Sequence, residues 1–226
     1  MTTFQSIYAR AAARKGGPEA LESLLPAVAS AERLASTPDS LLLSLAAKRV
    51  FAAGFVWRVV ENKWPAFTEP FRDWLPMGVA MLSDFDVDAL SQDPRIIRHR
   101  GKIEAVRANA RMMVEVAEEH GSFARFLADW PSSDLVGLLE WLKTHGSRLG
   151  GNTGSYFLRT AGKDAFILTS DVAEALVAAG VVDKAPTGKR AKRAVQEQFN
   201  AWAEESGRSY AEMSKVLACS VPGRRG

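Results

Sequence analysis

The sequence predicts an all-α protein. Apolar residues recur at the spacing of amphipathic helices along most of the 226 residues, and Gly or Pro separates one such segment from the next. Alternating runs that would predict strands are missing, since the one candidate, at 165–168, is too short to make a sheet alone. The chain is long enough for one well-packed core, or for a core divided between two lobes.

The helices expected in the first half are placed by residues that begin or end helices. Pro18 suits the first turn of a helix, whereas Gly54 and Gly121 suit the position just after one. Asp93 and Pro94 are interpreted as the start of a long helix. The expected segments are 18–35, 40–53, 57–64, 84–91 and 93–119.

The second half follows the same pattern. A glycine-rich stretch at 149–154 separates two expected helices, and Gly180 and Gly207 end two others. The expected segments are 122–130, 134–144, 155–161, 171–179, 189–205 and 209–221.

Basic residues are concentrated in two places, although the net charge is only +3. Six Lys or Arg residues lie between Arg95 and Arg111, with Glu104 as the one acid, and Lys189–Arg193 holds four more. Such clusters favour binding to phosphate. They are also typical of the solvated face of a helix, which is the commoner case.

Cysteine and histidine usage argues against a metal centre. The single cysteine, Cys219, excludes an internal disulfide framework, and the three histidines lack the spacing of zinc ligands. We expect neither a metal nor a cofactor. No apolar run approaches the ~20 residues that a membrane span requires, and the N-terminus has no secretion signal. We therefore expect a cytoplasmic protein without a membrane partner.

The glycine-rich turn is the first candidate binding element. Gly150, Gly151 and Gly154 permit positive φ and close approach of another chain, and Asn152 tolerates the left-handed region. A short turn between helices leaves main-chain N–H groups unpaired and directed outward, which suits a phosphate. The alternative is an ordinary helix–helix connection.

Asp171 follows this turn after the apolar link at 165–168 and opens the next expected helix. A carboxylate placed there could face the sugar attached to a phosphate bound by the turn. With Glu174 three residues later, Asp171 also fits a capping box, which stabilises a helix by about 1 kcal/mol. The two roles are compatible, because main-chain N–H groups keep a cap carboxylate ionised at neutral pH.

This order of hairpin and aspartate resembles the HhH-GPD superfamily of DNA glycosylases. Thr153–Phe157 resembles the second hairpin helix of alkylpurine DNA glycosylases, and the stretch from Val50 to Leu127 is similar to the bacterial 3-methyladenine DNA glycosylase I family. The motifs that carry the second resemblance are Ala53-Gly54, Phe55-Val56-Trp57, Asp93 to Arg111, and Gly121-Ser122-Phe123.

The resemblance implies a single glycosylase-like domain over 1–226, with two helical lobes around a cleft and with the hairpin and catalytic aspartate within 134–180. It implies base excision repair: hydrolytic removal of alkylated purines of the 3-methyladenine type from double-stranded DNA by a cytoplasmic, nucleoid-associated monomer. Superfamily members with lyase activity carry a nucleophilic lysine in or just before the hairpin. Asn152 and Trp141 stand near those places, which favours a monofunctional enzyme.

Site residues follow from the same resemblance. Asp171 would stabilise the oxocarbenium-like sugar or activate the attacking water, and Trp57 matches a tryptophan that stacks on the extruded base. The residues implied for the base pocket are Trp57, Arg49, Phe51 and Tyr8. Those implied for DNA binding are Gly150, Gly151, Asn152, Thr153, Gly154, Arg98, Arg100 and Lys102.

The chain departs from the family in three respects. It has no equivalent of the family's zinc ligands, Arg148 stands where the first Gly of the turn is usual, and Arg49 replaces a base-recognising glutamate. A guanidinium only donates hydrogen bonds, so it cannot accept hydrogen bonds from the edge of a base as a carboxylate does. Two alternatives therefore stay open: a catalytically inactive or altered-specificity DNA-binding protein on the same scaffold, and a helical interaction module unrelated to DNA.

Overall fold

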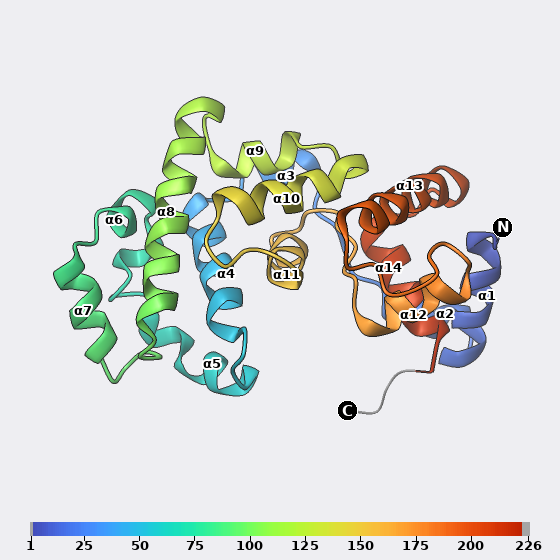
Figure 1. The fold of residues 1–226 in the computed structure, drawn as a ribbon, viewed down its shortest axis with the longest axis horizontal. Helices are drawn as coiled ribbons and strands as arrows, with labels where there is room; N and C mark the ends of the chain where they lie inside the picture. The colour runs from blue at the N-terminus through green and yellow to red at the C-terminus, as the bar shows by residue number, and fades with distance from the viewer. Residues whose placement is uncertain (1, 223–226) are drawn as a thin grey trace. The chain divides into compact units, whose positions relative to one another are not determined.

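A computed structural model describes residues 2–222, and every regular element in that range is a helix (Figure 1). The predicted all-α fold class is confirmed. The α-helices are α1 (Phe4–Lys15), α2 (Pro18–Glu22), α3 (Ala31–Ala35), α4 (Asp39–Ala52), α5 (Trp57–Lys63), α6 (Pro76–Ala80), α7 (Asp84–Gln92), α8 (Arg100–His120), α9 (Phe123–Asp129), α10 (Leu135–His145), α11 (Asn152–Thr160), α12 (Ser170–Ala178), α13 (Lys189–Ser206) and α14 (Tyr210–Ser220). The 3₁₀ helices are η1 (Trp64–Phe67), η2 (Arg72–Trp74) and η3 (Ser132–Asp134).

Two of the predicted helices are wrong in extent. The segment expected at 18–35 is interrupted after α2, because Pro26 has no N–H for a helical hydrogen bond, and α3 starts afresh at a cap made by Ser30. The helix expected from Asp93 begins only at Arg100, since the Asp93 carboxylate accepts the Arg95 amide at 2.9 Å and holds a turn there. Helices α1 and α6 were not predicted, and 165–168 is irregular.

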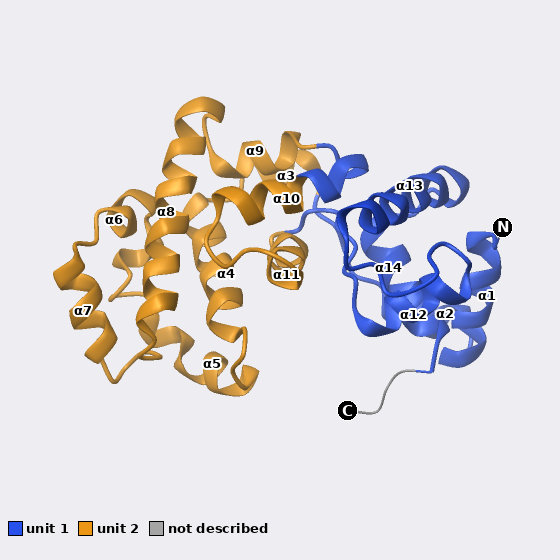
Figure 2. Cartoon of the chain, viewed as in Figure 1, with its two compact units in different colours: residues 1–29, 131–137, 162–226 blue, residues 30–130, 138–161 orange. Residues whose placement is uncertain are grey.

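The described chain divides into two compact units (Figure 2). Unit 1 consists of residues 1–29, 131–137 and 162–226, and unit 2 of residues 30–130 and 138–161. Helix α10 begins in unit 1 and continues into unit 2. The glycine-rich hairpin therefore belongs to unit 2, and Asp171 belongs to unit 1.

Unit 2 is built around α8, which packs against α4 and against α6 and α7 (Figure 1). Aromatic residues fill the space next to α4, and Phe51 contacts Phe67 edge-on at a centroid distance of 4.9 Å. Asp39, the first residue of α4, accepts hydrogen bonds from the amides of Phe123 and Ala124 at 2.9 Å and so caps α9. Helix α11 packs against α4.

Unit 1 has a separate aromatic core. Phe166 contacts Phe199 at a centroid distance of 4.5 Å, and Trp202 lies between Phe199 and Phe4 of α1. Asp164 accepts the amides of Tyr210 and Ala211 and thereby caps α14, against which α12 packs. Helix α12, which carries Asp171, is therefore held by a packed core.

Candidate functional site

The hairpin between α10 and α11 turns between Gly146 and Gly151, slightly earlier than the glycine-rich stretch expected at 149–154. Its main chain has positive φ at two points, Arg148 and Gly151, each with φ 59°. Arg148 was the residue expected in place of the first Gly of the turn, and it adopts the left-handed conformation that glycine takes most easily. Helix α11 starts at Asn152, and Gly151 before it provides no side-chain cap. Its first amides are thus not capped by a side chain.

Close packing explains why glycine stands at 154. A Cβ atom there would lie 2.4 Å from the Leu149 carbonyl oxygen, so only glycine lets α11 approach the turn. Thr153, the next expected DNA contact, is half-buried, whereas Gly151 and Asn152 are exposed. Among the hairpin residues expected to contact DNA, the exposed ones are therefore Gly151 and Asn152, at the start of α11.

Asn109 of α8 holds the hairpin in place. This side chain is fully buried; its amide nitrogen donates to the Ser147 carbonyl at 3.0 Å, and its oxygen accepts from the Ser147 amide at 2.7 Å. The guanidinium of Arg148 donates to the Gly101 carbonyl at 3.1 Å. Both contacts tie the turn to α8, and the sequence assigned no role to either residue.

Arg49, Trp57 and Tyr156 form a cluster in unit 2, brought together by α4, α5 and α11. The guanidinium carbon of Arg49 lies 4.8 Å from the Trp57 ring centroid and 5.3 Å from that of Tyr156. Its Nη2 atom donates to Thr160 Oγ1 at 2.6 Å. Burial lowers the pKa of the Arg49 guanidinium from its usual range, against the opposing effects of Tyr156 and Glu61. Tyr156 and Thr160 were missed as site residues, although Tyr156 lies in the segment used to recognise the hairpin.

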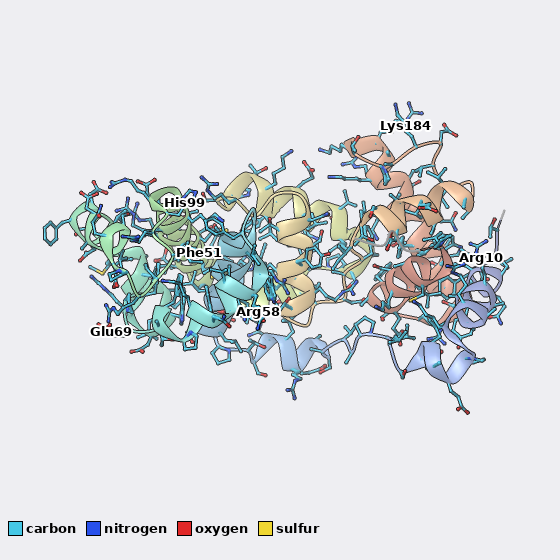
Figure 3. The ribbon with its side chains drawn as sticks, turned by 90° about the horizontal axis from the view of Figure 1, so that it is seen from below. Arg10, Phe51, Arg58, Glu69, His99 and Lys184 are labelled. Atoms are coloured by element: carbon cyan, nitrogen blue, oxygen red, sulfur yellow. The ribbon has the colours of Figure 1, made fainter. Side chains whose placement is uncertain are left out.

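Two residues expected in the base pocket lie elsewhere. Phe51 is fully buried among aromatic side chains of unit 2, so it presents no surface for stacking on a base (Figure 3). Tyr8 is in unit 1, where its hydroxyl donates to Glu22 at 2.6 Å and its ring faces Arg208. The hydrogen bond to Glu22 raises the pKa of Tyr8. Tyr8 thus belongs to a local polar network.

The basic stretch from Arg95 to Arg111 mostly serves the fold. Lys102 corrects the expectation of a phosphate contact, because it is only 3% exposed and its ammonium donates to the Phe51 and Ala53 carbonyls at 2.8 and 2.5 Å. Arg100 is exposed but pairs with Asp88 and Glu104. Arg98 is exposed. The other three bind acids or carbonyls of unit 2: Arg95 with Asp93 and Glu69, Arg107 with Asp84, and Arg111 with the Ala80 carbonyl.

The second basic cluster, at residues 189–193, differs from the first in its lack of ion pairs within the described residues. Lys189, Arg190, Lys192 and Arg193 occupy the first turns of α13, whose N-cap Gly188 has no side chain and whose first turn holds no acid. Among residues 2–222, none of these four is in an ion pair. Cations near a helix N-terminus oppose the helix dipole, so they do not stabilise α13. Their free charges favour an anionic partner.

Asp171 is the second residue of α12 and is half-buried. The expected capping role is wrong: the cap is Thr169, whose hydroxyl accepts from the Val172 amide at 3.2 Å. The Asp171 carboxylate lies 3.5 Å from the Ser170 hydroxyl. The expected place of Asp171 beside a helix N-terminus is confirmed, and its carboxylate is not used to cap the helix.

Over the described part of the chain, no set of three or more His, Cys, Asp or Glu side chains is arranged to hold a metal ion. Over the same residues, none of the helices combines the length and apolar character needed to cross a membrane.

Residues 39–136 match the model of the methyladenine glycosylase family, a segment that runs from the start of α4 to the start of α10. DNA-3-methyladenine glycosylase 1 of Escherichia coli is 37% identical over 75 residues, which cover 33% of this chain and 40% of the relative. DNA-3-methyladenine glycosylase of Haemophilus influenzae is 32% identical over 75 residues, with the same coverage. The chain thus spans 40% of the length of these curated relatives.

A solved structure extends the similarity. A single-residue variant of 3-methyladenine DNA glycosylase I, in complex with 3-methyladenine, matches with a TM-score of 0.50 and 27% identity. The match covers 70% of this chain and 94% of that chain. The helical fold is therefore similar to that of a 3-methyladenine DNA glycosylase beyond the segment that the family model matches.

We predict that Asn109→Ala destabilises unit 2 by about 2–3 kcal/mol, because both main-chain groups of Ser147 lose a buried partner. Urea unfolding measures the free energy, and hydrogen exchange of the Ser147 amide reports on the turn itself. Glu115→Ala, an exposed substitution on the same helix, is the control, with an expected change within about 0.5 kcal/mol. Unchanged exchange at Ser147 in the Asn109 variant would show that the turn does not depend on this contact.

Proposed function

We propose that the protein is a DNA N-glycosylase of the HhH-GPD superfamily, which hydrolyses the glycosidic bond of alkylated purines of the 3-methyladenine type in base excision repair. The observation that carries this proposal is the match of 39–136 to the methyladenine glycosylase model. The hairpin with uncapped amides and Asp171 beyond it support the proposal independently, because both lie outside that match.

The proposed chemistry needs an anion close to the sugar. N-alkylation makes the purine a good leaving group, so little acid catalysis is required, and positive charge develops on the sugar as the base departs. The carboxylate of Asp171 would stabilise this charge or activate the attacking water. Asp171 stands in the first turn of α12, where the helix dipole interacts favourably with a negative charge.

The proposed DNA contacts have three sources. The amides at the start of α11 would bind a phosphate, as helix N-termini do. Arg98 and the four basic residues of α13 would neutralise others. Trp57 would stack on the base once it is extruded from the duplex, since 38% of this residue is exposed.

We propose that the protein acts as a monomer, in the cytoplasm, at the nucleoid.

A monofunctional reaction is proposed because the hairpin offers no nucleophilic lysine. Asn152 stands at the start of α11. Lys143 lies on α10, where its side chain runs next to Gly150 and its ammonium is 4.0 Å from the Glu140 carboxylate. Hydrolysis by water, without strand cleavage, is the outcome that these positions favour.

A catalytically inactive or altered-specificity DNA-binding protein is the second candidate, and Arg49 favours it. The Arg49 guanidinium lies over the Trp57 ring, and the resemblance implies a glutamate at this sequence position. Base release from methylated DNA, measured by mass spectrometry, separates these candidates: an inactive protein binds DNA and releases no alkylated purine, whereas a protein of altered specificity releases little 3-methyladenine.

We predict that Asp171→Asn lowers the rate of base release about 10²–10³-fold, the usual effect of removing one electrostatic group that acts on the transition state. Affinity for duplex DNA should stay nearly unchanged, because the charge acts on the transition state more than on the bound duplex. Single-turnover kinetics and a binding titration measure the two effects. Asp183→Asn removes an exposed carboxylate from the same unit and controls for net charge. Full activity in the Asp171 variant would exclude the proposed role.

We predict that replacing Lys189, Arg190, Lys192 and Arg193 by Ala flattens the dependence of log K on log salt for duplex DNA. Each phosphate contact contributes a slope of about −0.9, so losing several contacts is measurable. Arg10→Ala with Arg14→Ala and Lys15→Ala removes three cations from α1 in the same unit and should leave the slope unchanged. An unaltered slope in the α13 variant would show that this cluster does not contact the phosphate backbone of DNA.

We predict that Trp57→Ala weakens binding to duplexes with a damaged base by roughly 5–150-fold, because stacking on an extruded base contributes about 1–3 kcal/mol. Binding to undamaged duplex should not change, since no base is extruded there. Titrations with matched oligonucleotides measure the difference. An equal loss on both duplexes would mean that Trp57 supports the fold or the general DNA contact.

A further inference from the structure

Arg49 is a partly buried cation without an acidic partner. None of the ion pairs within residues 2–222 includes it, and the nearby Glu61 instead pairs with Lys48 at 3.3 Å. A guanidinium carries five N–H donors, and the structure uses Nη2 for a hydrogen bond to Thr160. Partial burial of a cation that makes no ion pair is unfavourable, so the Arg49 guanidinium is suited to a ligand that supplies acceptors.

The rings next to Arg49 leave room for such a ligand. Trp57 and Tyr156 each remain 38% exposed, although the Arg49 guanidinium lies over part of both rings. A planar ligand that stacks on the exposed part of these rings would lie beside the guanidinium, with its edge against the N–H donors. The arrangement therefore combines partly exposed aromatic rings with a guanidinium next to them.

N–H donors of the protein that face the edge of a stacked purine distinguish guanine from adenine. Guanine presents two acceptors, O6 and N7, in the spacing that arginine binds through two parallel hydrogen bonds. Adenine presents an amino group in place of O6, and an amino group facing a guanidinium leaves donors of both groups unpaired.

We propose that Arg49 is the specificity-determining residue of the base site and that it selects N3-alkylated guanine over N3-alkylated adenine. This inference rests on the proposed function, because it concerns the base that the glycosylase extrudes. The comparison is well matched: in DNA both lesions carry the alkyl group at the same ring position and the same positive charge. Repulsion from Arg49 therefore acts on both alike, and the difference comes from the acceptors at the edge.

The first experiment measures recognition without catalysis. Free 3-methylguanine and 3-methyladenine are titrated into the full chain by calorimetry. We expect 3-methylguanine to bind about tenfold more tightly or better, the discrimination typical of a two-bond arginine contact. Arg49→Met, which keeps an unbranched side chain without donors, should abolish the preference, and Arg49→Glu, which accepts, should reverse it.

Arg58→Met is the control, since Arg58 is an exposed arginine of the neighbouring helix α5 (Figure 3). It should bind both bases as the unaltered chain does. Circular dichroism establishes that each variant is folded. The inference is overturned if the unaltered chain binds 3-methyladenine more tightly, if it binds neither base, or if the Arg49→Met variant keeps the original preference.

The second experiment separates this inference from the proposed function. Methylated DNA is incubated with the protein, and the released 3-methylguanine and 3-methyladenine are each related to their content in the DNA. Preferential release of 3-methylguanine, lost in Arg49→Met, supports both ideas. Release that favours 3-methyladenine contradicts the proposed role of Arg49 and leaves the glycosylase reaction standing. A chain that releases no base, yet binds free 3-methylguanine through Arg49, contradicts the glycosylase reaction and leaves the recognition site standing.

Discussion

The hydrogen-bonding demands of two buried polar side chains on α8 organise unit 2. Lys102 and Asn109 are separated by two helical turns, and both face the interior. A buried ammonium and a buried amide must find partners, or each would cost a large part of the stability of a domain. Lys102 binds the carbonyls at the end of α4, and Asn109 binds both main-chain groups of Ser147. Helix α8 thus fixes the end of α4 and the hairpin against the same scaffold.

The position of the Arg49 cluster follows from this constraint. Arg49 lies just before the end of α4, Trp57 follows it at the start of α5, and Tyr156 follows the hairpin on α11. Fixing the end of α4 and the turn at Ser147 brings these three elements together, although more than 90 residues of sequence separate Trp57 from Tyr156. Polar contacts made in the core therefore determine a site at the surface.

Local signals were sufficient to predict most of the helices but not the tertiary role of charged residues. Gly54, Gly121 and Gly207 end helices because glycine adopts the conformations that follow a helix most easily, and this depends on near neighbours alone. Lys102 was expected on the surface because lysine is seldom buried. Its burial depends on carbonyls about 50 residues earlier in the chain, which no local pattern reports. Tyr156 was missed for the same reason, since its partner Arg49 is on another helix.

The two basic stretches show how structure separates charge that serves the fold from charge that can serve binding. Between Arg95 and Arg111, most cations bind acids or main-chain carbonyls of unit 2, so their hydrogen-bonding capacity already serves the fold. The cations of α13 have no such partners among the described residues, and they stand where the helix dipole opposes them. Sequence composition makes the two stretches equivalent, whereas the structure favours α13 for a polyanion. The Arg49 guanidinium, which makes no ion pair within residues 2–222, belongs with this second group, and its aromatic neighbours are the reason that we propose a planar ligand with acceptors at its edge.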